Sequence, residues 1–594
     1  MLLVSRPAYS TTARAVVTAL LSVSLILLSM HTAAQALNRS IAVTVLGIEG
    51  DVYRNVLAHL SVSKSEKNKQ LLPEHEARQF LEQSIDEVKA ALQAFGYYEP
   101  EVRNSFEVQQ KWQLSINVNM GPQTKLRQVL IKFSGDGDDD RNLAALLQKA
   151  ELRSGAPLLH ENYSDFKSAL EQKAYGLGYL DAKYTSHAIT VYPSEQVADV
   201  ALHFDTGPMY FFGPISIEQD ALDPVFVARY IQVKEGDPFK SGSLTNLQLR
   251  LNETNYFDSV RVDVQRERAV DRHLPVAIIA TPRKSSAYDF SAGFGTDTGP
   301  RIGVLADYRR VNRQGHRFRN QAELSEFRST LVSQYVIPVD EVSSEYFDFS
   351  ATVEQENVND VNSIQYSLGS SLNENRWGGR SRAALEYVAE NWSFGAEPSE
   401  SARLFIPSLE FTWKQSNNTF YPTRGYSYTA RVLGAADSVL SGVSFAQVQL
   451  FAKAVLPLTP SSRLLLRGDF FTTATDDFNA LPPSLRFYAG GAQSVRGYGY
   501  KDLSPQDSAG NLIGGQYLAT VSAEFDYLVK GNFGLAAFVD AGDATDRLFE
   551  SFKVGAGLGL RYRSPVGMLR LDIAHPFDDP DSDYRIHISF GIDL

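Results

Sequence analysis

The chain has 594 residues, of which 43% are hydrophobic and 21% charged, with a formal net charge of −12 and no cysteine. This length accommodates several folded domains, and the charged fraction is too ordinary and too mixed in sign for a disordered chain. The lack of cysteine excludes disulfides, thiol catalysis and cysteine-ligated metal sites. A net acidic chain without a basic stripe does not fit a protein that binds nucleic acid.

Residues 1–36 have the order of a secretory signal peptide: a positively charged start, an apolar run over residues 16–28, and a small-residue tripeptide at 34–36. The apolar run is about 13 residues long, whereas a membrane-spanning helix needs roughly 20. We therefore expect export and removal of residues 1–36, not a retained anchor. No later segment has 18 uninterrupted apolar residues, so any membrane-spanning part is expected to be a β-barrel.

Between residues 37 and 284 the same block of strand, helix, helix, strand and strand occurs three times, at a spacing of about 86 residues. The blocks predict three α+β domains at residues 37–122, 123–206 and 207–284. Alternating strands are expected to open them at Ile41 to Leu46, Gln128 to Phe133 and Pro214 to Glu218.

Turn residues mark the ends of the second helix in each block. Gly96, Gly178 and Asn255 follow the helical pattern, and glycine or asparagine suits the left-handed conformation that stops a helix. In the second and third blocks this helix is predicted to start at Pro157 and Pro238, because proline is favoured at the first helical position.

From residue 285 to residue 594 the pattern changes to two-residue alternation, with 16 candidate strands of about ten residues. That length fits a tilted strand that crosses a membrane. In the last strand Ile586, Ile588 and Phe590 share an apolar face. A soluble sandwich would show the same alternation with its apolar face inward. The even count, the export signal and the aromatic residues at many strand ends favour an outer-membrane barrel whose apolar face meets lipid.

The longest break in this pattern runs roughly from Thr475 to Gln516 and contains Val495-Arg496-Gly497-Tyr498. A chain that enters from the periplasm places this break, between strands eleven and twelve, on the outer side. Loops of this length usually carry function. The ordinary interpretation of Arg496 is a solvated charge. Strand alternation, however, places Glu524 and Asp540 on the lumen side, where an inward-folded loop would let Arg496 form a two-pronged contact with a carboxylate.

Two motifs carry a family resemblance: Val495-Arg496-Gly497-Tyr498 in the loop and Phe538-Val539-Asp540-Ala541-Gly542 in a later strand. With them the chain resembles the Omp85 superfamily of outer-membrane assembly and translocation proteins, over nearly the whole mature chain. The resemblance implies that the three blocks are tandem periplasmic POTRA domains. It also implies that the arginine engages lumen partners Asp540, Gly542 and Glu524.

Three repeats and a length near 590 residues look most like the TamA branch of the superfamily. Five repeats would suggest BamA, and two a two-partner secretion transporter. The resemblance implies an outer-membrane location and unfolded outer-membrane protein substrates, particularly autotransporter-type ones. It further implies contact with outer-membrane lipid and a TamB-like partner anchored in the inner membrane. A secretion pore, or a component of a phospholipid conduit between the membranes, remains the alternative.

Closure of the barrel requires the first strand, Tyr288 to Gly295, to pair with the last, Tyr584 to Asp593. Glycines at this seam leave few cross-strand side-chain contacts. We therefore expect a weak seam that opens sideways and accepts substrate strands by edge pairing. The residues assigned to this lateral gate are Tyr288, Gly293, Gly295, Ile588, Phe590 and Gly591.

No enzyme, cofactor or metal site is expected. Asp297-Thr298-Gly299 is the tripeptide of aspartic proteases, but their chemistry needs two such aspartates sharing one proton in a dry site, and the tripeptide alone does not predict one. The ten histidines show no two-on-one-face pattern for zinc, and no serine lies in a nucleophile elbow.

Overall fold

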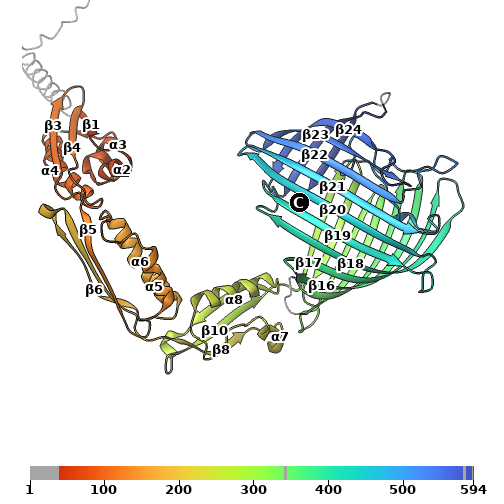
Figure 1. Ribbon diagram of the computed structural model, residues 1–594, viewed down its shortest axis with the longest axis horizontal. Helices are drawn as coiled ribbons and strands as arrows, with labels where there is room; N and C mark the ends of the chain where they lie inside the picture. The colour runs from red at the N-terminus through yellow and green to blue at the C-terminus, as the bar shows by residue number, and fades with distance from the viewer. Residues whose placement is uncertain (1–38, 340–343, 580–582, 592, 594) are drawn as a thin grey trace, which may run out of the picture. The chain divides into compact units, whose positions relative to one another are not determined.

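The computed structural model describes residues 39–339, 344–579, 583–591 and 593. The predicted signal peptide at residues 1–36 lies outside them. The described residues form three small sheets and one sheet of sixteen strands (Figure 1). Within the same residues, no helix is both long enough and apolar enough to span a bilayer.

The first small sheet has the strand order β2-β1-β4-β3, with β1 and β4 parallel. Alternate residues of β4 are buried, as expected for a strand with one face covered by helices. Trp112 anchors this core, because its ring is buried and its Nε1 donates to the Leu72 carbonyl at 2.8 Å. The elements are β1 Arg39–Leu46, α2 Gly50–His59, α3 Ser61–Lys67, β2 Leu71–Leu72, α4 Glu74–Gln93, β3 Glu101–Val108 and β4 Trp112–Asn119.

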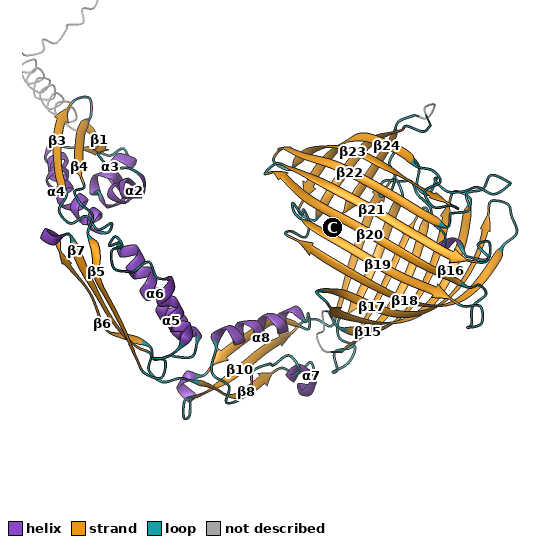
Figure 2. Cartoon of the chain, in the orientation of Figure 1, coloured by secondary structure: helices purple, strands orange, loops and turns teal. Residues whose placement is uncertain are grey.

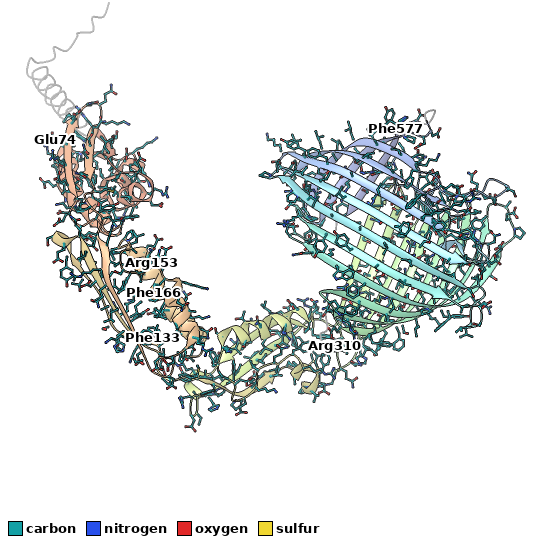
Figure 3. All side chains as sticks on the ribbon, in the orientation of Figure 1. Glu74, Phe133, Arg153, Phe166, Arg310 and Phe577 are labelled. Carbon is teal, nitrogen blue, oxygen red and sulfur yellow. The ribbon has the colours of Figure 1, made fainter. Side chains whose placement is uncertain are left out.

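The second and third sheets have the orders β5-β7-β6 and β8-β10-β9. Each has a longer helix beside it, α6 and α8 respectively (Figure 2). Phe166 on α6 belongs to the core of the second sheet, and Phe133 on β5 packs against that core (Figure 3). The elements are β5 Lys125–Ser134, α5 Arg141–Lys149, α6 His160–Gly176, β6 Lys183–Tyr192, η1 Pro193–Glu195, β7 Val197–Asp205, β8 Phe211–Glu218, α7 Pro224–Ala228, α8 Ser241–Glu253, β9 Phe257–Val264, η2 Arg266–Arg268 and β10 His273–Pro282.

The predicted left-handed helix stops are confirmed, since φ is +82° at Gly96, +100° at Gly178 and +61° at Asn255. The predicted proline starts are wrong: α6 begins at His160 and α8 at Ser241. Pro157 and Pro238 instead lie in short bridges to Lys125 and Phe211, at the start of each sheet.

Hydrogen bonds next to each proline explain the delayed helix starts. The amide of Leu158 donates to Thr124, and that of Phe239 to Tyr210, both at 2.9 Å. The chain is therefore paired with the first strand of its sheet for several residues before the helix begins.

The large sheet runs in sequence order from β11 to β26 with every neighbouring pair antiparallel, and its tilted strands form a barrel (Figure 1). The predicted count of sixteen is confirmed. The strands are β11 Ser286–Gly295, β12 Gly299–Tyr308, β13 Arg317–Ser325, β14 Arg328–Pro338, β15 Tyr346–Val358, β16 Val361–Arg376, β17 Gly379–Phe394, β18 Glu400–Ser416, β19 Gly425–Ala435, β20 Phe445–Thr459, β21 Ser462–Thr475, β22 Tyr517–Lys530, β23 Phe533–Thr545, β24 Lys553–Ser564, β25 Gly567–Pro576 and β26 Arg585–Gly591.

Side-chain exposure separates the barrel from the sandwich alternative. Along β23, the apolar Leu535 and Val539 are about half exposed, whereas the charged Asp540 is buried. A soluble sandwich would bury the large apolar residues and expose the charged one. The reverse pattern is that of a barrel with a lipid-facing apolar surface and a polar lumen.

The seam between the first and last strands is only partly paired. Among the described residues, no ladder joins β11 to β26. Two hydrogen bonds connect them just beyond the end of β11: the Thr296 amide donates to the Ile588 carbonyl at 3.3 Å, and the Ile588 amide donates to Thr296 Oγ1 at 3.4 Å. The barrel is therefore nearly closed, with a weakly bonded edge.

Candidate functional site

The loop between β21 and β22, residues 476–516, folds into the barrel lumen and includes the short helix η3, Pro483–Leu485. Val495 and Ala489 are fully buried, in a cluster that also contains Leu518 of β22 and Ala544 of β23. The loop turns back at Gly490, where φ is +97°, a conformation that side chains disfavour. The arginine motif is therefore held against the inside of the wall.

Arg496 is 4% exposed and touches three carboxylates. Its Nε and Nη2 donate to the two oxygens of Asp540 at 2.7 and 2.9 Å, and its backbone amide donates to the same side chain at 3.1 Å. Nη1 donates to Glu524 at 2.6 Å and to Asp572 at 3.1 Å. The guanidinium also lies 3.4 Å from the ring centre of Phe538. A planar fork is matched to this set of acceptors.

The protonation of Arg496 follows from these neighbours. Burial alone would lower its pKa, but the hydrogen bond and charge of Asp540, with the charges of Glu524 and Asp572, hold the pKa above its ordinary value. The guanidinium is therefore a fixed cation. Its role in this site is electrostatic and structural, with no proton to exchange.

Glycines on the wall let the loop approach. A Cβ on Gly555 of β24 would lie 1.8 Å from the Arg496 carbonyl oxygen. Gly542, predicted as a lumen partner, instead lies against the neighbouring strand, where a Cβ would be 2.4 Å from the Ala519 carbonyl oxygen. In the loop motif that contains Arg496, the amide of Gly497 donates to His587 Nε2 at 3.0 Å.

The side chain of Tyr498 reaches the loop that precedes the last strand. Its hydroxyl donates to Asp578 at 3.4 Å. Burial and the charge of Asp578 raise the pKa of Tyr498 to about 12. The phenol therefore stays protonated at neutral pH and remains a hydrogen-bond donor.

Beyond Arg496, a chain of buried ion pairs crosses the lumen wall. Arg561 lies 2.8 Å from Glu524 and also pairs with Asp572 and, at 3.4 Å, with Asp526. Arg463 then connects Asp526, at 2.7 Å, to Asp593, at 2.8 Å. The members of this ion-pair ladder are Arg463, Arg496, Arg561, Arg570, Glu524, Asp526, Asp540, Asp572 and Asp593, all buried.

The alternation of sign along the ion-pair ladder is what allows its burial. A buried charge without a partner costs several kcal/mol, so each carboxylate here must have an arginine beside it. The two-residue alternation of β25 places Arg570 and Asp572 on the same polar face. Alternation contains no information on which charged residues of the neighbouring strands β21 to β25 lie at the same height on the lumen wall.

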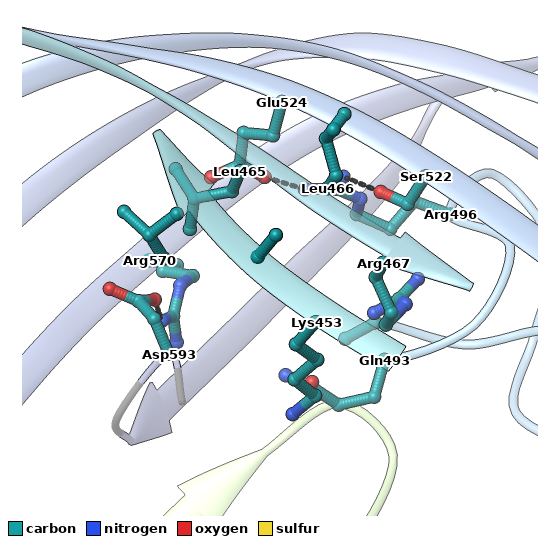
Figure 4. Close-up of a pocket in the computed structure, with 13 residues that line it drawn as sticks. Lys453, Leu465, Leu466, Arg467, Gln493, Arg496, Ser522, Glu524, Arg570 and Asp593 are labelled. Carbon is teal, nitrogen blue, oxygen red and sulfur yellow. Dashed lines mark hydrogen bonds and ion pairs between the residues drawn. The ribbon is translucent and has the colours of Figure 1, made fainter. Parts of the chain in front are cut away.

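A cavity of about 70 Å³ lies beside the loop (Figure 4). Its lining includes Lys453, Arg467 and Gln493, together with Arg496 and Glu524. The arginine loop is therefore packed tightly on β22 to β25 and leaves polar space toward β20 and β21.

The predicted gate residues lie on the two free edges of the sheet. Tyr288 and Phe590 are about half exposed on the lipid side. A Cβ on Gly295 would lie 3.6 Å from the Ile588 carbonyl oxygen, whereas one on Gly293 would meet Arg301 of the neighbouring strand at 3.1 Å. Nothing described lies within 4 Å of a Cβ built on Gly591. The contact between the edges is thus concentrated at the outer end of β11.

The barrel has sixteen strands, an apolar outer face and a loop that an arginine anchors inside the lumen. These features are those of an outer-membrane β-barrel protein. Residues 305–593 match the Omp85 superfamily domain, and residues 42–120 match the POTRA domain described as TamA domain 1. The barrel belongs to the Omp85 superfamily. It lies in the outer membrane, with POTRA-type domains in the periplasm.

Individual relatives are distant. The chain is 24% identical over 514 residues to the outer membrane protein assembly factor BamA of Nitratidesulfovibrio vulgaris, covering 78% of this chain and 61% of the relative. It is 23% identical over 460 residues to BamA of Neisseria meningitidis serogroup B, covering 70% and 57%. The crystal structure of Haemophilus ducreyi BamA lacking POTRA domains 1–3 has the same fold, with a TM-score of 0.67, 16% identity, and coverage of 78% of this chain and 98% of that one.

Proposed function

We propose that this protein is a TamA-type assembly factor that inserts β-barrel proteins, autotransporter-type ones in particular, into the outer membrane. The observation that carries the proposal is the seam, where β11 and β26 share two hydrogen bonds at Thr296 and no ladder among the described residues. An unpaired strand in lipid leaves backbone groups unsatisfied, each at a cost of several kcal/mol. Two weakly joined edges offer such a strand a place to pair.

In this proposal the gate consists of Tyr288, Gly293 and Gly295 on one edge and Ile588, Phe590 and Gly591 on the other. Substrate strands pair with the opened edges while the arginine loop braces the lumen wall at β22, β23 and β25, on the β26 side of the seam. No catalytic chemistry is involved. The work is done by backbone hydrogen bonding.

We further propose that the three small sheets belong to three POTRA domains at residues 37–122, 123–206 and 207–284, and that the first of them binds a TamB-like protein anchored in the inner membrane. The match of residues 42–120 to the TamA-type first domain supports this assignment. So does β3, an edge strand of its sheet with backbone groups free to pair with a partner.

A disulfide across the seam is expected to abolish substrate assembly. The chain has no cysteine, so the double variant Thr296→Cys/Ile588→Cys carries one defined thiol pair. The two backbones are within hydrogen-bond distance, which a disulfide can span. We expect the oxidised protein, reconstituted in liposomes, to lose insertion of an autotransporter-type barrel and the reduced protein to regain it.

The matched control joins two strands that are already paired. Val304→Cys/Ala322→Cys links register partners of β12 and β13, and oxidation there is expected to leave insertion unchanged. Full activity of the oxidised seam variant would contradict the lateral gate.

Deletion of residues 37–120 is expected to abolish co-purification of the TamB-like partner. The barrel should remain in the outer membrane and keep the heat-dependent electrophoretic shift of a folded barrel, because β11 to β26 form their own sheet. Retained co-purification would mean that the partner binds another part of the chain.

A strain that lacks the whole protein tests the phospholipid-conduit alternative. Loss of lipid asymmetry in that strain, with its β-barrel proteins retained, would favour this alternative.

A further inference from the structure

The turn between β11 and β12 holds one end of the arginine loop. Asp297, in the tripeptide that resembles an aspartic protease motif, accepts the amide of Ala492 on Oδ2 at 2.8 Å. A Cβ on Gly491 would lie 2.9 Å from the same oxygen, and φ at Gly491 is +102°. Glycine therefore permits the close approach. The carboxylate belongs to the first hairpin of the barrel, on one side of the seam.

The same short segment of the loop touches the other side of the seam. The amide of Gly497 donates to His587 Nε2 of β26 at 3.0 Å. Asp502 lies 3.7 Å from Arg585, the first residue of β26. A Cβ on Gly499 would lie 2.4 Å from an Arg585 nitrogen, so the loop and β26 are in close contact.

We propose that residues 491–502 form a clasp across the outer end of the seam, with Asp297 on the β11 side and His587 and Arg585 on the β26 side. Lateral opening then requires the release of one side of the clasp. This inference rests on the proposed lateral gate and names the residues that regulate it.

The position of Arg496 indicates which side is released. Arg496 lies within the clasp and is bound to Asp540, Glu524 and Asp572, on strands β22, β23 and β25. These strands continue directly to β26, so Arg496 fixes the clasp to the β26 side of the barrel. Lys501 of the clasp also pairs with Glu356 of β15 at 2.6 Å, away from the seam. Asp297 is the contact with the opposite hairpin. Opening should therefore break the Asp297 contact and leave the loop in place.

The test compares two carboxylates that hold the same loop by the same kind of bond. Asp297 accepts from Ala492 beside the seam, whereas Asp360, just before β16, accepts from Leu512 at 3.1 Å away from it. The reporter is the rate of disulfide formation in Thr296→Cys/Ile588→Cys under a mild oxidant, without substrate. Loss of a hydrogen bond to a charged group changes an equilibrium by about tenfold or more.

We expect Asp297→Ala to slow disulfide formation about tenfold and Asp360→Ala to leave it unchanged. Asp297→Asn should stay near the parent rate, because its side-chain oxygen still accepts the amide. Gly491→Ala breaks the contact from the loop side and should reproduce the slowing. Each variant is first checked for the heat-dependent mobility of a folded barrel.

Equal rates in Asp297→Ala, Gly491→Ala and the parent would overturn the clasp, and so would equal slowing in Asp360→Ala. The proposed clasp and the proposed gate can be contradicted separately in this design. If Asp297→Ala slows disulfide formation across the seam but leaves the insertion of substrate barrels unaltered, the clasp is retained and the proposed function is contradicted. An unaltered rate contradicts the clasp whatever the result for insertion.

Discussion

Asp540→Ala is expected to destabilise the barrel by about 3–5 kcal/mol, the usual cost of removing one partner of a buried ion pair. Asp540 is 0% exposed and accepts three hydrogen bonds from Arg496, one from the backbone and two from the side chain. Its removal leaves Arg496 partly unpaired and releases the loop from β23. Urea-dependent unfolding in detergent micelles, followed by electrophoretic mobility, measures the loss.

The matched control is Asp543→Ala on the same strand. Asp543 is only partly buried and bonds to the exposed Ser551 at 2.7 Å, so its loss should cost less than about 1 kcal/mol. Arg496→Lys should be nearly as damaging as Asp540→Ala, because one ammonium cannot replace a fork that reaches several acceptors at once. If the free energy of unfolding of Asp540→Ala is within about 1 kcal/mol of that of the parent protein, Asp540 is not the anchor of the loop.

Exchange of the two charges is a more discriminating experiment. In Arg496→Asp/Asp540→Arg, the new aspartate would face Glu524 and Asp572, which now contact Arg496 at 2.6 and 3.1 Å. Like charges at this distance repel, so the exchange should not restore stability. Restoration would indicate an isolated pair instead of the ion-pair ladder.

Some of this site could be predicted from the sequence because it depends on local patterns. The two-residue period of β22 and β23 fixes the face on which Glu524 and Asp540 lie, and the long break between strands marks the loop. Periodicity fixes neither the height of a residue in the barrel nor which side chains of the nearby strands lie beside it. Arg496 and Asp572 are 76 residues apart, and their contact depends on loop folding and strand register together.

The contact made by Asp297 could not be predicted from the sequence either. Its tripeptide does not indicate a partner, and the partner, Ala492, lies 195 residues further along the chain. A local rule failed at Pro157 and Pro238 for a related reason. Pairing with the first strand of each small sheet took precedence over the helix-start preference of proline.

Arg463→Met is expected to cost about 3–5 kcal/mol, because it leaves two buried carboxylates with weaker partners. Arg463 lies 2.7 Å from Asp526 and 2.8 Å from Asp593. Its guanidinium also lies 3.9 Å from the ring centre of Tyr421. Methionine keeps most of the side-chain volume, so the loss measured by urea unfolding reports the charge rather than a cavity.

Arg563→Met is the control, since Arg563 lies 3.5 Å from the same Tyr421 ring and pairs with no carboxylate among the described residues. It should cost less than about 1 kcal/mol. Adding Asp526→Leu to Arg463→Met should recover part of the loss, because replacing both members of a buried pair by apolar groups removes the unpaired charge. If the two substitutions change the free energy of unfolding additively, Asp526 is solvated in the lumen and the ion-pair ladder ends at Arg561.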